Sequence, residues 1–157
     1  MNDVISHSTE RFSMSGVEIL LIEDNRHDVE MILDAIGEQY TTDKICVLRD
    51  GAEALNYFFG QQGCINAETH HLPKLILLDL KLPKMTGLEV LHIIKNDRRT
   101  RHVPIVIVTS SRDEPDMKVA YEAGVNSYVV KPVDFEQFIN SMSSLGLYWL
   151  LVNEPLK

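Results

Sequence analysis

Five short runs of apolar residues, rich in Val, Ile and Leu, recur along the chain without alternating with polar residues. Strands that are buried on both faces have this pattern, and such strands occur in parallel sheets that helices cover. The runs span residues 17–22, 45–48, 75–78, 105–108 and 128–130. They predict the strands of a parallel sheet.

Helical patterns fill the intervals between these runs. Several begin or end at capping or breaking residues, such as Asp50 with Glu53 before the second helix and Gly37 after the first. The positions that mark the five helices are Val29, Ile32, Leu33 and Ile36; Ala54, Leu55, Phe58 and Phe59; Leu88, Leu91 and Ile94; Asp113, Pro115, Asp116 and the closing Gly124; and Phe135, Phe138, Ile139, Met142 and Trp149. A βα unit repeated five times, with right-handed crossovers, predicts a doubly wound α/β fold of the flavodoxin-like type.

The 157 residues suffice for one domain with its own core. We expect a flexible leader at 1–16, one domain at 17–152 that ends in a long helix, and a short tail at 153–157. Because few residues follow Leu150, we expect no separate output domain. The apolar run 145–152 exceeds what one core-facing stripe needs, and it predicts a symmetric homodimer through the C-terminal helix region. The alternative is that the last turns fold back on the domain.

The acidic balance limits the classes of partner. A net charge of -8 disfavours nucleic acid and anionic membranes as partners. The chain has neither an apolar run of membrane-spanning length nor a signal peptide pattern, so we expect a cytoplasmic protein. Cys46 and Cys64 are expected to be reduced thiols, although a bridge between them stays open.

Chemically capable residues follow four of the five runs directly. They are Glu23 and Asp24, Asp79, Thr109, and Lys131 with Pro132. Because ligands of open α/β sheets bind at the carboxyl ends of the strands, we expect these side chains to converge on one rim. The alternative, that each is an ordinary solvated loop residue, would require five coincidences.

The predicted cluster has a specific chemistry. Three neighbouring carboxylates repel one another, and Mg²⁺ relieves this repulsion through oxygen ligands. A carboxylate can act as a nucleophile on phosphorus. Asp79 is the best candidate because its strand should lie beside the first one, while Glu23 and Asp24 would hold the cation. Lys131 and Thr109 would contact the transferred phosphoryl group.

These residues, in the stretches LLIEDN, LILLDLKLPKMTGLEVL, PIVIVTSS and NSYVVKP, resemble the receiver domain of two-component response regulators. The resemblance covers about residues 17–150. It implies that Asp79 accepts a phosphoryl group from a sensor histidine kinase and becomes 4-aspartylphosphate. It also implies that the backbone carbonyl of Lys81 joins Glu23, Asp24 and Asp79 as a Mg²⁺ ligand.

The resemblance assigns further roles around the acceptor. Thr109 and Tyr128 correspond to the switch pair of the family, in which the hydroxyl moves toward the phosphoryl group and the ring turns inward. Lys131 corresponds to the ion-pairing lysine, and its bond to Pro132 would be cis. Lys81 and Ser111 occupy positions that tune hydrolysis of the phosphoryl group.

Softer features, including the longer loop after the second helix and the Tyr148-Trp149 ending, resemble phytochrome-associated response regulators. The implied function is a signalling receiver that acts through protein contacts and catalyses only its own phosphorylation and dephosphorylation. Two alternatives are less well supported. A phosphatase with an aspartate nucleophile needs a second acid two residues later, where this chain has Lys81. A flavodoxin-like cofactor binder needs a phosphate cradle where Glu23 and Asp24 would repel phosphate.

Overall fold

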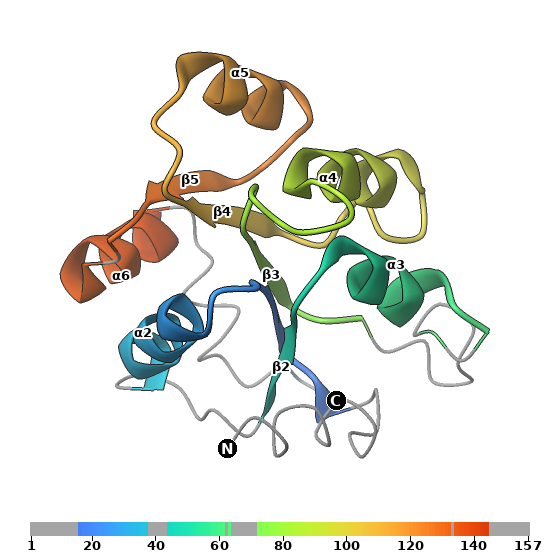
Figure 1. Ribbon diagram of the computed structural model, residues 1–157, viewed down its shortest axis with the longest axis horizontal. Coiled ribbons are helices and arrows are strands. Elements are labelled where there is room, and N and C mark those ends of the chain that lie inside the picture. The colour runs from blue at the N-terminus through green and yellow to red at the C-terminus, as the bar shows by residue number, and fades with distance from the viewer. Residues whose placement is uncertain (1–15, 38–43, 62, 64–71, 133, 145–157) are drawn as a thin grey trace.

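A computed structural model describes residues 16–37, 44–61, 63, 72–132 and 134–144. In this part of the chain, one parallel sheet has the strand order β2-β1-β3-β4-β5, with β3 directly beside β1 as expected (Figure 1). The strands are β1 (Ile19–Ile22), β2 (Ile45–Leu48), β3 (Leu75–Leu78), β4 (Ile105–Thr109) and β5 (Ser127–Val130). The predicted doubly wound, flavodoxin-like α/β fold is therefore confirmed.

The helices cover both faces of the sheet (Figure 1). On one face lie α2 (Arg26–Gly37) and α6 (Phe135–Ser144), and on the other lie α3 (Gly51–Phe59), α4 (Gly87–Asn96) and α5 (Glu114–Glu122). Successive residues of a strand point to opposite faces, so Ile19 and Leu21 pack toward α2 and α6 while Leu20 and Ile22 pack toward α3–α5. Both faces are buried, which is why the runs are apolar without alternation.

Caps fix where the helices begin. The Asp50 side chain accepts a hydrogen bond from the Glu53 N–H at 2.8 Å, as the capping box predicts. The Glu53 carboxylate accepts from the Arg49 N–H at 2.7 Å, one residue earlier than in the usual box. Thr86 caps α4 in the same way, accepting from the Glu89 N–H. Asp113 precedes α5 as expected, but its side chain makes no capping hydrogen bond.

Some expected boundaries shift or fall outside the described residues. The first strand begins at Ile19, two residues after the apolar run begins, and Thr109 is the last residue of β4 instead of the residue after it. Cys46 is buried in β2. Residues 1–15 of the expected leader 1–16, Cys64, and the apolar run 145–152 with Trp149 lie outside the described residues. Among the helices of the described part, none has the length and apolar character to cross a membrane.

One close backbone approach ties α4 to the segment after β3. A Cβ atom on Gly87 would lie 2.1 Å from the carbonyl oxygen of Asp79 and 2.6 Å from the Cα of Leu80. The Gly87 N–H also donates to the Leu80 carbonyl at 2.9 Å. Only glycine allows α4 to begin this close to the residue after β3.

Gly87→Ala is therefore expected to lower the free energy of unfolding by about 2 kcal/mol, because the added methyl group overpacks a site where backbone atoms must shift to make room. Urea denaturation measures the change. Gly16→Ala is the matched control, because a Cβ at Gly16 meets nothing within 4 Å and its unfolding free energy should stay within about 0.5 kcal/mol of wild type. Equal stability of the two variants would contradict this account.

Candidate functional site

The carboxyl ends of the strands meet at one rim, and backbone hydrogen bonds hold the residues that follow them. The Glu23 N–H donates to the Leu48 carbonyl at 2.9 Å, and the Asp79 N–H donates to the Ile22 carbonyl at 3.0 Å. The Lys131 N–H donates to the Thr109 carbonyl at 2.8 Å. The side chains that the sequence analysis predicts to converge are thus brought together by the ends of the parallel ladder.

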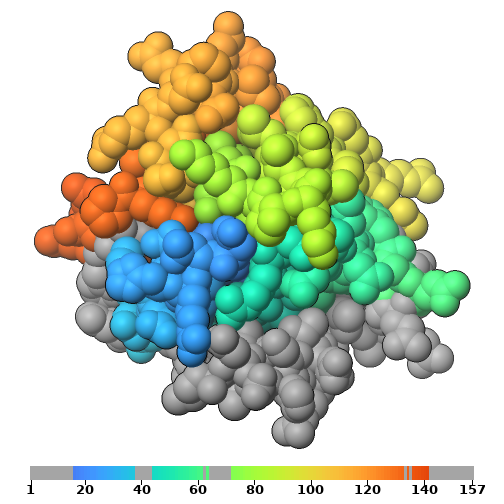
Figure 2. Space-filling view, viewed as in Figure 1, coloured from blue at the N-terminus to red at the C-terminus, as the bar shows by residue number. Residues whose placement is uncertain are grey.

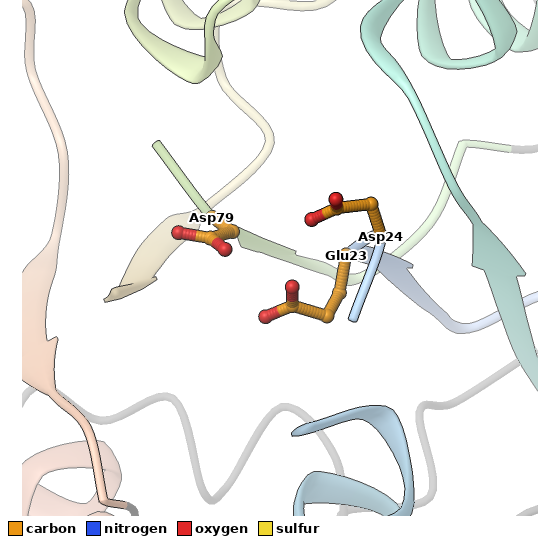
Figure 3. A group of neighbouring side chains, drawn as sticks. All are labelled: Glu23, Asp24 and Asp79. Atoms are coloured by element: carbon orange, nitrogen blue, oxygen red, sulfur yellow. The ribbon is translucent and has the colours of Figure 1, made fainter. Parts of the chain in front are cut away.

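Three acids gather at the centre of this rim. Glu23 and Asp79 are buried and Asp24 is exposed. One oxygen from each lies within 4.8 Å of the others, and in Figure 3 the carboxylates of Glu23 and Asp24 point toward the side where Asp79 lies. Among the described residues, this is the acidic group whose geometry suits a metal ion. The oxygen donors match what a hard divalent cation requires.

The electrostatics of the group support that fit. Burial raises the pKa of Glu23 to about 7; the hydrogen bond with Lys131 opposes this shift and the neighbouring Asp79 charge adds to it. A buried carboxylate that is costly to ionise beside a second carboxylate gains most from a bound cation. The acids therefore fit a divalent metal site.

Lys131 lies opposite these acids. Its Nζ is 2.5 Å from Glu23 Oε1, 2.8 Å from Asp28 Oδ2 and 3.1 Å from Asp79 Oδ2. Burial by itself would lower the pKa of Lys131, but hydrogen bonds with Asp28 and Glu23 and the Asp79 charge raise it above its ordinary value. The ammonium therefore stays charged, and it bridges the ends of β1, β3 and β5.

Asp28 is the member of the site that the sequence analysis missed. It lies in the first turn of α2, one turn beyond the Glu23-Asp24 pair. An acid in a first turn is ordinary helix chemistry, so its position alone indicates nothing more. The sequence does offer one indication, which is the short distance along the chain from the end of β1 to Asp28. A helix that starts directly after β1 has its first turn near the rim.

Thr109 and Tyr128 are linked through Ser111. Thr109 is fully buried at the end of β4, and its Oγ1 lies 3.4 Å from the Ser111 N–H that donates to it. The Tyr128 hydroxyl donates to the Ser111 carbonyl at 3.0 Å, and burial raises the pKa of Tyr128. The Ser111 hydroxyl donates to Asp116 Oδ2 at 2.7 Å, so it is engaged with α5. The two residues of the expected switch pair thus both contact Ser111, in the loop after β4.

The residues next to the acceptor candidate and the lysine complete the rim. The Lys81 N–H donates to Asp79 Oδ1 at 3.2 Å, while its side chain is exposed. The peptide bond between Lys131 and Pro132 is cis, as the resemblance implies. In Figure 2 the blue segment that carries the start of α2 borders the yellow-green segment around α4, so parts of the chain far apart in sequence meet on this face.

Comparisons with known proteins agree with this geometry. The family model described as "Response regulator receiver domain" matches residues 19–143. The probable methanogenesis regulatory protein FilR2 of Methanothrix harundinacea is 40% identical over 84% of this chain and 83% of its own length. The response regulator Rcp1 of Synechocystis sp. is 35% identical over 84% of this chain and 88% of its own length.

Solved structures give the same result. The bacteriophytochrome response regulator RtBRR has a TM-score of 0.73 and 44% identity over 89% of this chain and 84% of its own. The Mn²⁺-bound form of Rcp1 has a TM-score of 0.68 and 34% identity over 90% and 99% of the two chains. The phosphorylated cyanobacterial phytochrome response regulator RcpA has a TM-score of 0.68 and 32% identity over 89% and 96%.

The raised pKa of Glu23 predicts a pH-dependent affinity for divalent cations. A protonated Glu23 cannot ligate, so a proton and the cation compete for it. Below pH 7 the affinity should fall by up to about tenfold per pH unit, and above pH 7.5 it should level off. Calorimetric titration with Mg²⁺ between pH 5.5 and 8.5 measures the curve. An affinity that is constant down to pH 5.5 would contradict the raised pKa.

Proposed function

This chain belongs to the response regulator receiver domain family, and from that premise we propose that it accepts a phosphoryl group on Asp79 from a sensor histidine kinase. The observation that carries the proposal is the position of Asp79. Its carboxylate is buried at the end of β3, 3.1 Å from Lys131 Nζ and within 4.8 Å of the Glu23 and Asp24 oxygens.

The reaction is a transfer from nitrogen to oxygen. A carboxylate oxygen of Asp79 attacks the phosphorus of a phosphohistidine, an O–P bond forms, the P–N bond breaks, and the electron pair returns to the imidazole nitrogen. Lys131 faces the phosphoryl oxygens and offsets their charge. The Lys81 N–H donates to Asp79 Oδ1 and Lys131 Nζ lies 3.1 Å from Asp79 Oδ2, so both groups would orient the carboxylate for the attack.

Glu23, Asp24 and Asp79, with the backbone carbonyl of Lys81, are the proposed ligands of Mg²⁺. When bound, the cation offsets negative charge on the transferred group. Without it, the three carboxylates would repel an incoming phosphoryl group.

The response to phosphorylation is proposed to pass through Thr109. Its hydroxyl would turn to donate to a phosphoryl oxygen, and the Ser111 segment beside it would move as well. Because the Tyr128 hydroxyl bonds to the Ser111 carbonyl, a shift of this segment would reposition the Tyr128 ring. The surface around β5 and α5 would then differ between the two states.

The relatives guide the choice of partners. RtBRR and RcpA carry the name of phytochromes, whereas FilR2 is named for methanogenesis. The higher identity with RtBRR supports a phytochrome-type kinase as the phosphodonor of this chain.

We further propose that the protein is cytoplasmic, signals by protein contacts and forms a homodimer through its C-terminal helix region. Its only catalysis would be its own phosphorylation and dephosphorylation, because Lys81 stands where a phosphatase needs an acid.

Acetyl phosphate with Mg²⁺ tests the central claim. The wild-type chain should gain a single phosphate that is stable in acid and labile in base, detected by intact mass. Asp79→Asn removes the nucleophile and should abolish labelling, while retaining the shape of the side chain. Asp34→Asn, on the exposed side of α2, is the matched control and should label as wild type does.

Two results would count against the proposal. Labelling of Asp79→Asn at the wild-type level would place the phosphate elsewhere. Multiple-turnover release of phosphate from unrelated phosphomonoesters would favour the phosphatase alternative.

A further inference from the structure

Lys131 has a partner that stands outside the candidate metal group. The Asp28 oxygen at 2.8 Å is nearer to Nζ than the Asp79 oxygen at 3.1 Å. With Glu23 as the third acceptor, the three N–H groups of the ammonium each have a carboxylate oxygen. Asp28 therefore helps to set the direction of the Lys131 side chain, together with the two acids of the candidate metal group.

Asp28 is itself held in place. Its N–H donates to Asn25 Oδ1 at 3.0 Å, and the Asn25 N–H donates to Glu23 Oε2 at 3.2 Å. The carboxylate sits in the first turn of α2, where the helix dipole favours a negative charge. Its side chain is only 22% exposed. Asp28 thus has a defined position relative to Glu23.

The three partners of Lys131 differ in what a cation would do to them. Glu23 and Asp79 belong, with Asp24, to the group whose oxygens lie within 4.8 Å of one another, and Asp28 does not. A divalent cation bound by that group would compete with the ammonium for the oxygens of Glu23 and Asp79 and would repel it. Asp28 then remains as the carboxylate that Lys131 does not share with the cation.

We propose that Asp28 is a positioning residue for Lys131, which keeps the ammonium beside Asp79 while Glu23 and Asp79 bind a divalent cation. This rests on the proposed function, in which the cation and Lys131 act on the same acceptor. Asp28 itself contacts neither the cation nor the phosphoryl group.

The proposal predicts that Asp28 and Lys131 are energetically coupled in cation binding. Asp28→Asn removes a nearby negative charge, which weakens cation binding directly. It also frees the ammonium to pair more fully with Glu23 and Asp79, so that the ammonium would compete with the cation for their oxygens. Lys131→Gln eliminates the second effect and leaves the first, so a double-mutant cycle separates them.

Mn²⁺ binding, followed by electron paramagnetic resonance at pH 8 without a phosphodonor, measures the cycle. Asp28→Asn should weaken Mn²⁺ binding about fivefold or more in the wild-type background, where both effects act, and less than about twofold in the Lys131→Gln background, where only the direct loss of charge remains. The same factor in both backgrounds would overturn the proposal, because Asp28 would then act only as a distant charge.

Controls exclude a general effect of charge or folding. Asp34→Asn, an exposed acid on the same helix, should bind Mn²⁺ as wild type does. Asp28→Glu keeps a carboxylate that can reach Nζ and should recover most of the affinity.

A second readout uses the wild-type chain alone. Nitrogen-15 spectra of the lysine ammonium groups should show slow proton exchange at Lys131 both with and without Mg²⁺. Fast exchange in the Mg²⁺ state would overturn the proposal even if Asp28→Asn folds poorly.

Failure of the wild-type chain to bind Mn²⁺ would instead contradict the proposed cation site, and with it the role of Asp28. If the wild-type chain binds Mn²⁺ but gains no phosphate, the assignment of Asp79 as the phosphoryl acceptor is contradicted. The double-mutant cycle would still test the role of Asp28.

Discussion

The rim of this protein depends on one ammonium group among carboxylates. Among the described residues, Glu23, Asp28 and Asp79 each place an oxygen within hydrogen-bond distance of Lys131 Nζ. Buried acids this close together destabilise a fold unless a cation offsets them. Lys131 supplies a permanent positive charge, but one charge cannot balance three carboxylates. The remaining negative potential is what makes the rim suited to a divalent cation.

The sheet makes this arrangement possible. Parallel strands end at the same rim, and their order puts β3 beside β1 with β4 and β5 following. Glu23 and Asp79 therefore leave adjacent strands at the same level, as the pairing of Ile22 with Leu78 requires. The apolar layers on both faces keep the sheet rigid, so the acids cannot separate to relieve their repulsion. Burial of both faces of the sheet thus holds the acids close together at the rim.

The loop after β4 connects the rim to the surface of the molecule. Thr109 ends β4 at the rim, and Ser111 follows it within the loop that leads to α5. Hydrogen bonds from this loop reach Tyr128 on β5 and Asp116 on α5. In the proposed function, a change at Thr109 would therefore reach Tyr128 and Asp116 through the hydrogen bonds of this loop. The chain belongs to the receiver family, and its relatives include proteins named for phytochromes and for methanogenesis.

The strands of the sheet and most residues of the rim can be predicted from the sequence. Buried parallel strands must be apolar on both faces, so their apolar runs can be recognised in the sequence. The residues that follow these runs, such as Asp79 and Lys131, are then identified as rim residues by their position. Only the tertiary structure decided how the ammonium is shared. Asp28 reads in sequence as an ordinary first-turn acid, and its contact with Lys131 spans 103 positions of the chain. Its spacing after β1 places Asp28 near the rim, but the contact itself depends on how α2 packs against the sheet relative to the end of β5. The engagement of the Ser111 hydroxyl by Asp116 likewise follows from the path of the loop before α5, which spacing does not reveal.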